Sequence, residues 1–215
     1  MMLLQNLQEA QSLNTAGASM LAKNNRKGAV RAFKTAVQIM ESVSMSPEAD
    51  GKIRSNQEQP CGAMGSMPSL DDSFYVYNQP LLFHVLPQAI DMGFYNGIIM
   101  FNLALVFHQE AVFRGDFAKF QKAKNLYQLC INLMTGDKTA ASGAVILAAM
   151  NNSVHASLRL GAYDDFRSGI ENLTEQAAAV STQKSTAPTP FERMHLEEFY
   201  LNITLASEPT TAPVA

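Results

Sequence analysis

The side chains best suited to chemistry in this chain are its histidines and cysteines, and they are widely spaced. They are His84, His108, His155 and His195, with Cys61 and Cys130. A zinc site needs ligands at short, fixed spacings, and the sequence has neither an HExxH motif nor a pair of CxxC motifs. His108 and Glu110, two residues apart, would lie on different sides of a helix. We therefore expect no metal ion and no cofactor.

Motifs for nucleotide binding and nucleophilic catalysis are also missing from the sequence. There is no GxGxxG or Walker loop to hold a phosphate and no GxSxG turn to expose a serine. Cys130 falls in the apolar pattern of a predicted helix, which favours a core position over a nucleophile. Aspartate pairs at 71–72 and 164–165 precede apparent element starts, where capping explains them better than acid catalysis. The sequence predicts a protein that is not an enzyme.

Positive charge is concentrated around one predicted turn. The residues concerned are Lys23, Arg26, Lys27, Arg31 and Lys34. Nucleic-acid surfaces usually interleave aromatic side chains, but only Phe33 is near, and the formal net charge of the chain is −3. We expect a solvated turn and no nucleic-acid partner, with an acidic peptide as the alternative.

Composition indicates a folded chain, because 47% of its 215 residues are hydrophobic and only 16% are charged. The first residues, MMLLQNLQEA, lack a positively charged leader, so no signal peptide is expected. The longest apolar stretch, 81–107, contains polar residues, and its cleaner part, 97–107, is too short to span a membrane. Two distant cysteines favour a reducing compartment, so we expect a cytoplasmic or nuclear location.

Apolar residues recur at the helical period along most of the chain and are interrupted by polar or glycine-containing turns. The pattern predicts an all-α fold of helical-hairpin repeats, with three hairpins and a terminal helix in one domain, 1–207, before a flexible tail, 208–215. The predicted segments are hairpin one at 2–45, a long loop and extended strap at 46–84, hairpin two at 88–135, hairpin three at 138–182 and a capping helix at 190–206.

The segment between the first two hairpins differs in kind from the rest. Residues 47–72 are rich in proline and glycine and show no period, which indicates a loop. The following FYVYNQPLLF, 74–83, is aromatic and β-prone, but Pro80 favours an extended strap over a central strand. Further on, Thr189-Pro190-Phe191-Glu192 has the pattern of a capping box and would start the last helix.

Hairpin one has a specific spacing of small and large apolar residues. Gly17 and Ala29 are twelve residues apart. Phe33 follows Ala29 by four residues, and Ala36 follows Phe33 by three. Small residues at these points let two antiparallel helices approach closely. A glycine inside a helix costs about 1 kcal/mol against alanine, so close packing is the expected reason for Gly17.

This spacing resembles the tetratricopeptide repeat, a helical hairpin that usually holds another protein. In hairpin two, Asn102, Leu103 and Ala104 match the family pattern, although the hairpin is longer than the family standard. Hairpin three matches weakly, because Phe166 stands where a small residue is usual. Equivalent positions of the first two hairpins are 87 residues apart, against about 34 in a regular array. The combination of one short repeat, the loop insert, the FYVYNQPL strap and the long helix IIMFNLALVFHQE also resembles divergent repeat proteins expanded in diatoms. An ordinary helical bundle is the alternative.

The resemblance implies a superhelix in which the first helix of each hairpin lines a groove for a peptide or helix. The corresponding groove positions are Asn14, Leu21, Phe101, Leu105, His108, Asn151, His155, Leu158 and Arg159. Alternatively, Phe101 and Leu105 pack against the neighbouring hairpin or the strap.

One function within the family is not expected. The clamp for C-terminal carboxylates of chaperones needs cationic side chains in the groove. Asn102 matches the clamp, but its cationic positions are occupied in this chain by Asn14, Ala148 and Asn152. The sequence therefore argues against a co-chaperone role.

Two functions follow from the pattern. The first is a non-catalytic adaptor or scaffold that binds another protein or peptide in the groove. The second is an obligate structural subunit of a larger complex or homo-oligomer, in which the strap and the long second hairpin are buried against a partner chain. Methionines and the aromatic strap would supply the apolar contacts.

Overall fold

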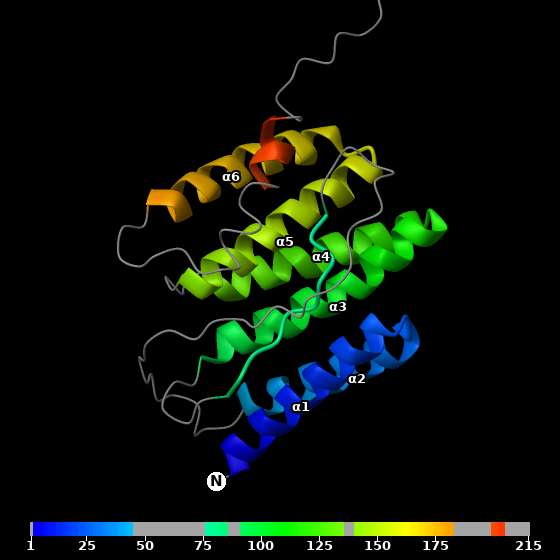
Figure 1. Ribbon diagram of the computed structural model, residues 1–215, viewed down its shortest axis with the longest axis vertical. Helices are drawn as coiled ribbons and strands as arrows, with labels where there is room; N and C mark the ends of the chain where they lie inside the picture. The colour runs from blue at the N-terminus through cyan, green and yellow to red at the C-terminus, as the bar shows by residue number, and fades with distance from the viewer. Residues whose placement is uncertain (1, 45–75, 86–90, 136–139, 183–198, 205–215) are drawn as a thin grey trace, which may run out of the picture.

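The computed structural model describes residues 2–44, 76–85, 91–135, 140–182 and 199–204 (Figure 1). Its helices are α1 (Met2–Ala22), α2 (Arg26–Ser44), α3 (Met92–Arg114), α4 (Phe117–Met134), α5 (Ala140–Arg159) and α6 (Tyr163–Thr182). Residues 199–204 are also helical, and none of the described residues belongs to a strand. The all-α prediction is confirmed.

Each pair of helices is joined by a tight turn whose residues fit its backbone. Asn24 has a φ of 60°, and the Asn25 side chain accepts a hydrogen bond from the Gly28 amide. Gly115, with a φ of 65°, ends α3, and the Asp116 carboxylate accepts from a backbone amide in the first turn of α4. Only glycine and a few polar residues adopt such positive φ values readily. The turns of the first two hairpins therefore lie at residues 23–25 and 115–116.

The helices of each pair pack through a glycine. A Cβ atom added to Gly17 would lie 2.6 Å from Cε1 of Phe33, so the phenyl ring occupies the space that a side chain would need. Gly97 is packed in the same way against Met134 of α4, and Gly169 against Val154 of α5. The close packing expected for Gly17 is thus a feature of all three hairpins.

The three pairs are stacked in chain order. α2 contacts α3, and α4 contacts α5, while α1 also contacts α3 and α3 contacts α5. The first helices of the pairs therefore form a row, α1–α3–α5. One main cluster of buried apolar side chains includes residues from all six helices, from 76–85 and from the short helix at 199–204. The described segments share one core.

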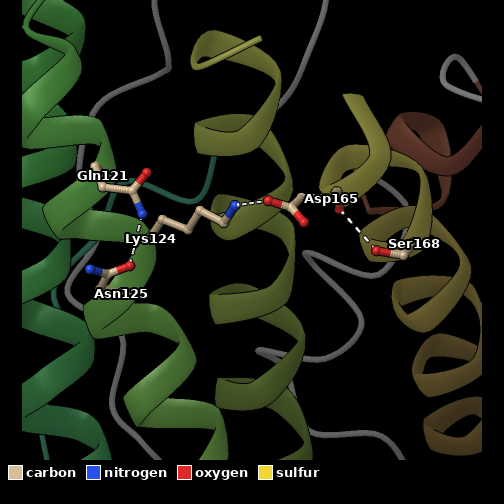
Figure 2. Close-up of polar contacts among 5 residues, drawn as sticks. All are labelled: Gln121, Lys124, Asn125, Asp165 and Ser168. Atoms are coloured by element: carbon tan, nitrogen blue, oxygen red, sulfur yellow. Dashed lines mark hydrogen bonds and ion pairs between the residues drawn. The ribbon is translucent and has the colours of Figure 1, made fainter. Parts of the chain in front are cut away.

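A surface ion pair joins the second and third hairpins (Figure 2). Nζ of Lys124 in α4 lies 2.6 Å from Oδ2 of Asp165 at the start of α6. The Asp165 side chain is 61% exposed, and exposed pairs of this kind contribute at most about 1 kcal/mol to stability. Packing of the buried helix faces, rather than this pair, must hold the hairpins together.

Some predicted boundaries change or lie outside the described residues. Helix α3 begins at Met92 rather than at 88, because Asp91 has extended backbone angles and caps the helix by accepting from the Phe94 amide. The loop at 46–75, the start of hairpin three at 138 and the capping box at 189–192 lie outside the described residues. Of the predicted last helix, the described part, 199–204, is helical.

Candidate functional site

Residues 76–85, which we call the strap, cross the row of first helices (Figure 1). Tyr77 is hydrogen-bonded to Asn152 of α5, Leu81 to Asn102 of α3, and Val85 to Gln11 of α1. The strap therefore runs from α5 over α3 to α1, opposite to the order in which the helices follow along the chain.

Asparagine side chains hold the strap by its main chain at Leu81. The Leu81 amide donates to Oδ1 of Asn102 over 2.7 Å, and Nδ2 of Asn102 donates to the Leu81 carbonyl oxygen, also over 2.7 Å. Asn14 of α1 donates to the same carbonyl over 3.0 Å and accepts from Asn102 over 2.8 Å. All three residues are fully buried. Both backbone groups of Leu81 are thus satisfied by side chains instead of water.

A second asparagine binds the strap at Tyr77 in the same way, with one accepted and one donated hydrogen bond. We call each such pair of bonds an asparagine grip. The Tyr77 amide donates to Oδ1 of Asn152 over 2.9 Å, and Nδ2 of Asn152 donates to the Tyr77 carbonyl oxygen over 2.7 Å. Nδ2 of Asn152 also donates to the Tyr127 hydroxyl, and Asn151 donates to Oδ1 of Asn152. Asn202, from the short last helix, donates to Asn151 over 2.6 Å. This grip is therefore supported by three further polar side chains.

The C-terminal end and the middle of the strap have weaker polar contacts. Oε1 of Gln11 accepts from the Val85 amide over 3.0 Å, and Nε2 of Gln11 lies 3.2 Å from Nδ1 of His84. Between the two asparagine grips, Nε2 of Gln109 donates to the Asn78 carbonyl oxygen over 3.1 Å. Like the asparagine grips, these contacts use helix side chains, so they leave the backbone hydrogen bonding of the helices intact.

The apolar side chains of the strap point into the core. Tyr77 and Leu81 are fully buried, and Phe83 is nearly so. The Tyr77 ring packs at a tilt against Phe101 of α3, with 5.7 Å between ring centres, and Phe83 stacks on Tyr95 at 4.9 Å. Burying each such side chain contributes roughly 2 kcal/mol. The strap thus combines sequence-independent main-chain contacts with specific side-chain contacts.

Two histidines lie beside the Tyr77 grip. Nε2 of His108 is 2.8 Å from Nδ1 of His155, their rings are stacked, and Nδ1 of His108 is 3.3 Å from the Tyr127 hydroxyl. Burial, followed by the charges of His155 and Arg159, lowers the pKa of His108 well below its usual value. Burial raises the pKa of the Tyr127 hydroxyl. At neutral pH His108 is therefore uncharged. It is one member of the chain of hydrogen bonds that runs from His155 to the strap, and it adds no charge to that chain.

Most of the groove positions expected from the sequence are buried. The fully or nearly fully buried ones are Asn14, Leu21, Phe101, Leu105, His108, Asn151 and His155. Leu158 is half-buried, while Arg159 is exposed with its guanidinium 5.8 Å from the Phe120 ring centre. Among the described residues, these positions therefore do not form a solvent-open lining. Phe101 packs against the strap, as the alternative prediction had it.

The residues that hold the strap were not predicted in that role. Asn102 was considered as part of the family pattern and, like Asn152, as a position of a carboxylate clamp. Gln11 and Tyr127 were not connected with the strap. A signal was present, because each of the three first helices carries an asparagine within its apolar stretch: Asn14, Asn102 and Asn152. Amides buried on helices need partners outside those helices, and an extended segment supplies them.

Metal-ligating and thiol side chains are the other candidates for chemistry within the described ranges. There, no three His, Cys, Asp or Glu side chains gather into a group that could hold a metal ion. Cys130 is fully buried, which raises the pKa of its thiol, and it packs in the core as predicted. None of the helices in the described part of the chain is both long and apolar enough to cross a membrane.

Comparisons of the chain with protein-family models, with curated proteins and with solved structures found no match.

Proposed function

We propose that this protein is a non-catalytic adaptor that holds an extended segment of another protein across the α1–α3–α5 row. We place it in the cytoplasm or nucleus and regard it as a divergent member of the tetratricopeptide-like repeat proteins. The spacing of Gly17, Ala29 and Phe33 and the stacking of three helical hairpins support that relationship.

One observation carries the proposal: two buried asparagines, Asn102 and Asn152, each bond the amide and the carbonyl of a single extended residue. A side-chain amide presents one acceptor and two donors, so it matches the main chain of any residue in an extended segment. Such contacts give affinity for a peptide backbone, while neighbouring pockets give sequence preference. A helix row built this way is suited to bind an extended chain.

The proposal is tested with a variant in which the strap is loosened, Tyr77→Ala/Leu81→Ala. This variant is used to select binders from a displayed library of linear peptides, and the selected peptides are then measured again with Asn102→Ala added. We expect a loss of affinity of about 30-fold or more, since a bidentate contact to a buried main chain is removed. The matched control adds Asn132→Ala, an exposed asparagine on the outer side of α4, and leaves affinity unchanged.

Two outcomes would overturn the proposal. In one, the loosened variant remains folded by circular dichroism but selects no peptide. In the other, the selected peptides bind equally well with and without Asn102, which would place them elsewhere on the surface.

A second candidate function, the subunit of a homo-oligomer, is favoured by apolar side chains at the α3–α4 turn. Phe113 is 74% exposed, Phe117 64% and Val112 45%. Grouped exposed apolar residues often mark protein contacts. Because Tyr77, Leu81 and Phe83 of the strap are buried in their own chain, this candidate relies on the exposed turn rather than on those side chains. Sedimentation velocity of the wild type and of Phe113→Ser/Phe117→Ser tests this candidate: a dimer that the substitutions dissociate supports it, and a wild-type monomer excludes it.

A further inference from the structure

We propose that the strap is an internal competitor for the peptide-binding face, and that the partner's segment has the strap's own pattern: an aromatic residue, three variable residues and then leucine. The partner would run in the strap's direction, from α5 to α1. This inference rests on the proposed function and adds to it the chemistry of the partner and the means of regulation.

The spacing in this pattern follows from the positions of the two asparagine grips. Asn152 bonds Tyr77 and Asn102 bonds Leu81, which are four residues apart. The two asparagines are on helices that pack directly against each other, so the distance between the grips is fixed by the core. An extended chain advances about 3.3 Å per residue, so an occupant with a different spacing could satisfy only one grip.

The side chains required at the two gripped positions follow from their surroundings. Tyr77 packs against the Phe101 ring and is fully buried, so the first position needs an aromatic group. Leu81 is also fully buried within the main apolar cluster. By contrast, residues 78–80 are only half-buried, and Pro80 has no amide to offer. The three positions between the grips therefore tolerate varied side chains.

The strap is suited to displacement because it lies outside the helical hairpins. The six helices pair and stack through their own contacts, and α1–α3 and α3–α5 touch directly. The strap adds side-chain-mediated hydrogen bonds and three buried side chains, Tyr77, Leu81 and Phe83, to one face but takes part in no helix, so a segment with the same pattern can replace its contacts. A tethered occupant has an effective concentration of the order of millimolar, so a partner must compete against it. The partner's apparent affinity then equals its intrinsic affinity multiplied by the fraction of molecules in which the face is open.

The test uses a fluorescent synthetic peptide with the strap sequence VYNQPLLFHV, added to the full-length wild type and to the Tyr77→Ala/Leu81→Ala variant. If the wild-type face is open in about 1% of molecules, the variant binds the peptide up to ~100-fold more tightly. In a control peptide, one glycine is inserted after Gln79, so that both leucines move one residue further from the tyrosine and none lies four residues after it. We expect this control to bind at least tenfold more weakly. Equal affinity of wild type and variant, or of the two peptides, would refute the inference.

A second measurement uses the wild type and does not depend on the folding of a variant. The protein is labelled with ¹⁵N, the peptide is unlabelled, and amide exchange of Tyr77 and Leu81 is followed by NMR. Their amides donate to Asn152 and Asn102, so displacement by the peptide must accelerate their exchange in a saturable manner. Exchange that is unchanged at saturating peptide would contradict a competing strap.

The two proposals can fail separately. The inference fails, and the adaptor function stands, if library peptides require Asn102 but lack the aromatic-and-leucine pattern. The same holds if such peptides leave the amide hydrogen exchange of Leu81 unchanged. The absence of any Asn102-dependent peptide would overturn both.

Discussion

Replacement of Asn102 by alanine is the perturbation whose effect follows most directly from the structure. The side chain makes three hydrogen bonds, two to the backbone of Leu81 and one to Asn14, and all of these groups are buried. At about 1 kcal/mol for each bond, the loss is about 3 kcal/mol. The Leu81 amide and the Asn14 oxygen would also lose a partner each, which raises the expected loss to about 3–5 kcal/mol. Leu81 keeps one bond, from Asn14 to its carbonyl.

The assay is urea unfolding monitored by circular dichroism, with thermal unfolding as a second reading. For a chain of this size, a loss of about 3 kcal/mol lowers the melting temperature by roughly 6–12 °C. The control is Gln121→Ala, which removes an exposed bond between the amides of Gln121 and Asn125 within α4 (Figure 2) and costs only a few tenths of a kcal/mol. If Asn102→Ala cost no more than this control, the strap would not depend on its asparagine grip.

Three further predictions concern packing, protonation and thiol access. Gly17→Ala places a methyl group against the Phe33 ring and lowers the free energy of unfolding in urea by about 1–3 kcal/mol. Gly143→Ala costs less, because the added Cβ atom would have a single neighbour, Cγ2 of Val180 at 3.3 Å. Equal effects of the two substitutions would contradict the close approach at Gly17. The lowered pKa of buried His108 means that the unfolded chain binds more protons below about pH 6.5, so the free energy of unfolding falls as the pH drops, by up to about 1.4 kcal/mol per pH unit. His108→Gln removes this part of the slope between pH 7 and 5, and an unchanged slope would assign it to other groups. Cys130 is fully buried and its thiol pKa is raised. We therefore expect peptide mapping after treatment with a thiol reagent to find Cys130 unmodified in native protein and modified in urea. Rapid labelling of the native protein would contradict its position in the core.

Helix limits and turns could be read from the sequence because their causes are local. The αL positions at Asn24 and Gly115 and the cap at Asp116 are determined by neighbouring residues, and the sequence displays those residue types directly. Gly17 was also informative, because a glycine inside a helix requires a packing reason, and Phe33 at the right spacing supplied it. The start of α3 was misplaced because Asp91 was not recognised as its cap.

The path of the strap could not be read in the same way, because its contacts join residues far apart in the chain. Asn14 and Asn102 are 88 residues apart, and Tyr77 and Asn152 are 75 apart. No periodic pattern links such pairs. The prediction that Pro80 favours a strap rather than a strand was sound, but it gave no information on which helices the strap would cross. As a result, residues expected to line an open groove, such as Phe101, were found beneath a segment of their own chain.

The central claim is that buried asparagines on the first helices hold an extended segment by its main chain, and hydrogen exchange of the Tyr77 and Leu81 amides in the wild-type protein tests it most directly. The account predicts slow exchange at both amides, with Asn102→Ala accelerating Leu81 more than Tyr77, because Asn102 accepts only from Leu81. Exchange at the rate of an unstructured peptide at both positions in the wild type would contradict it.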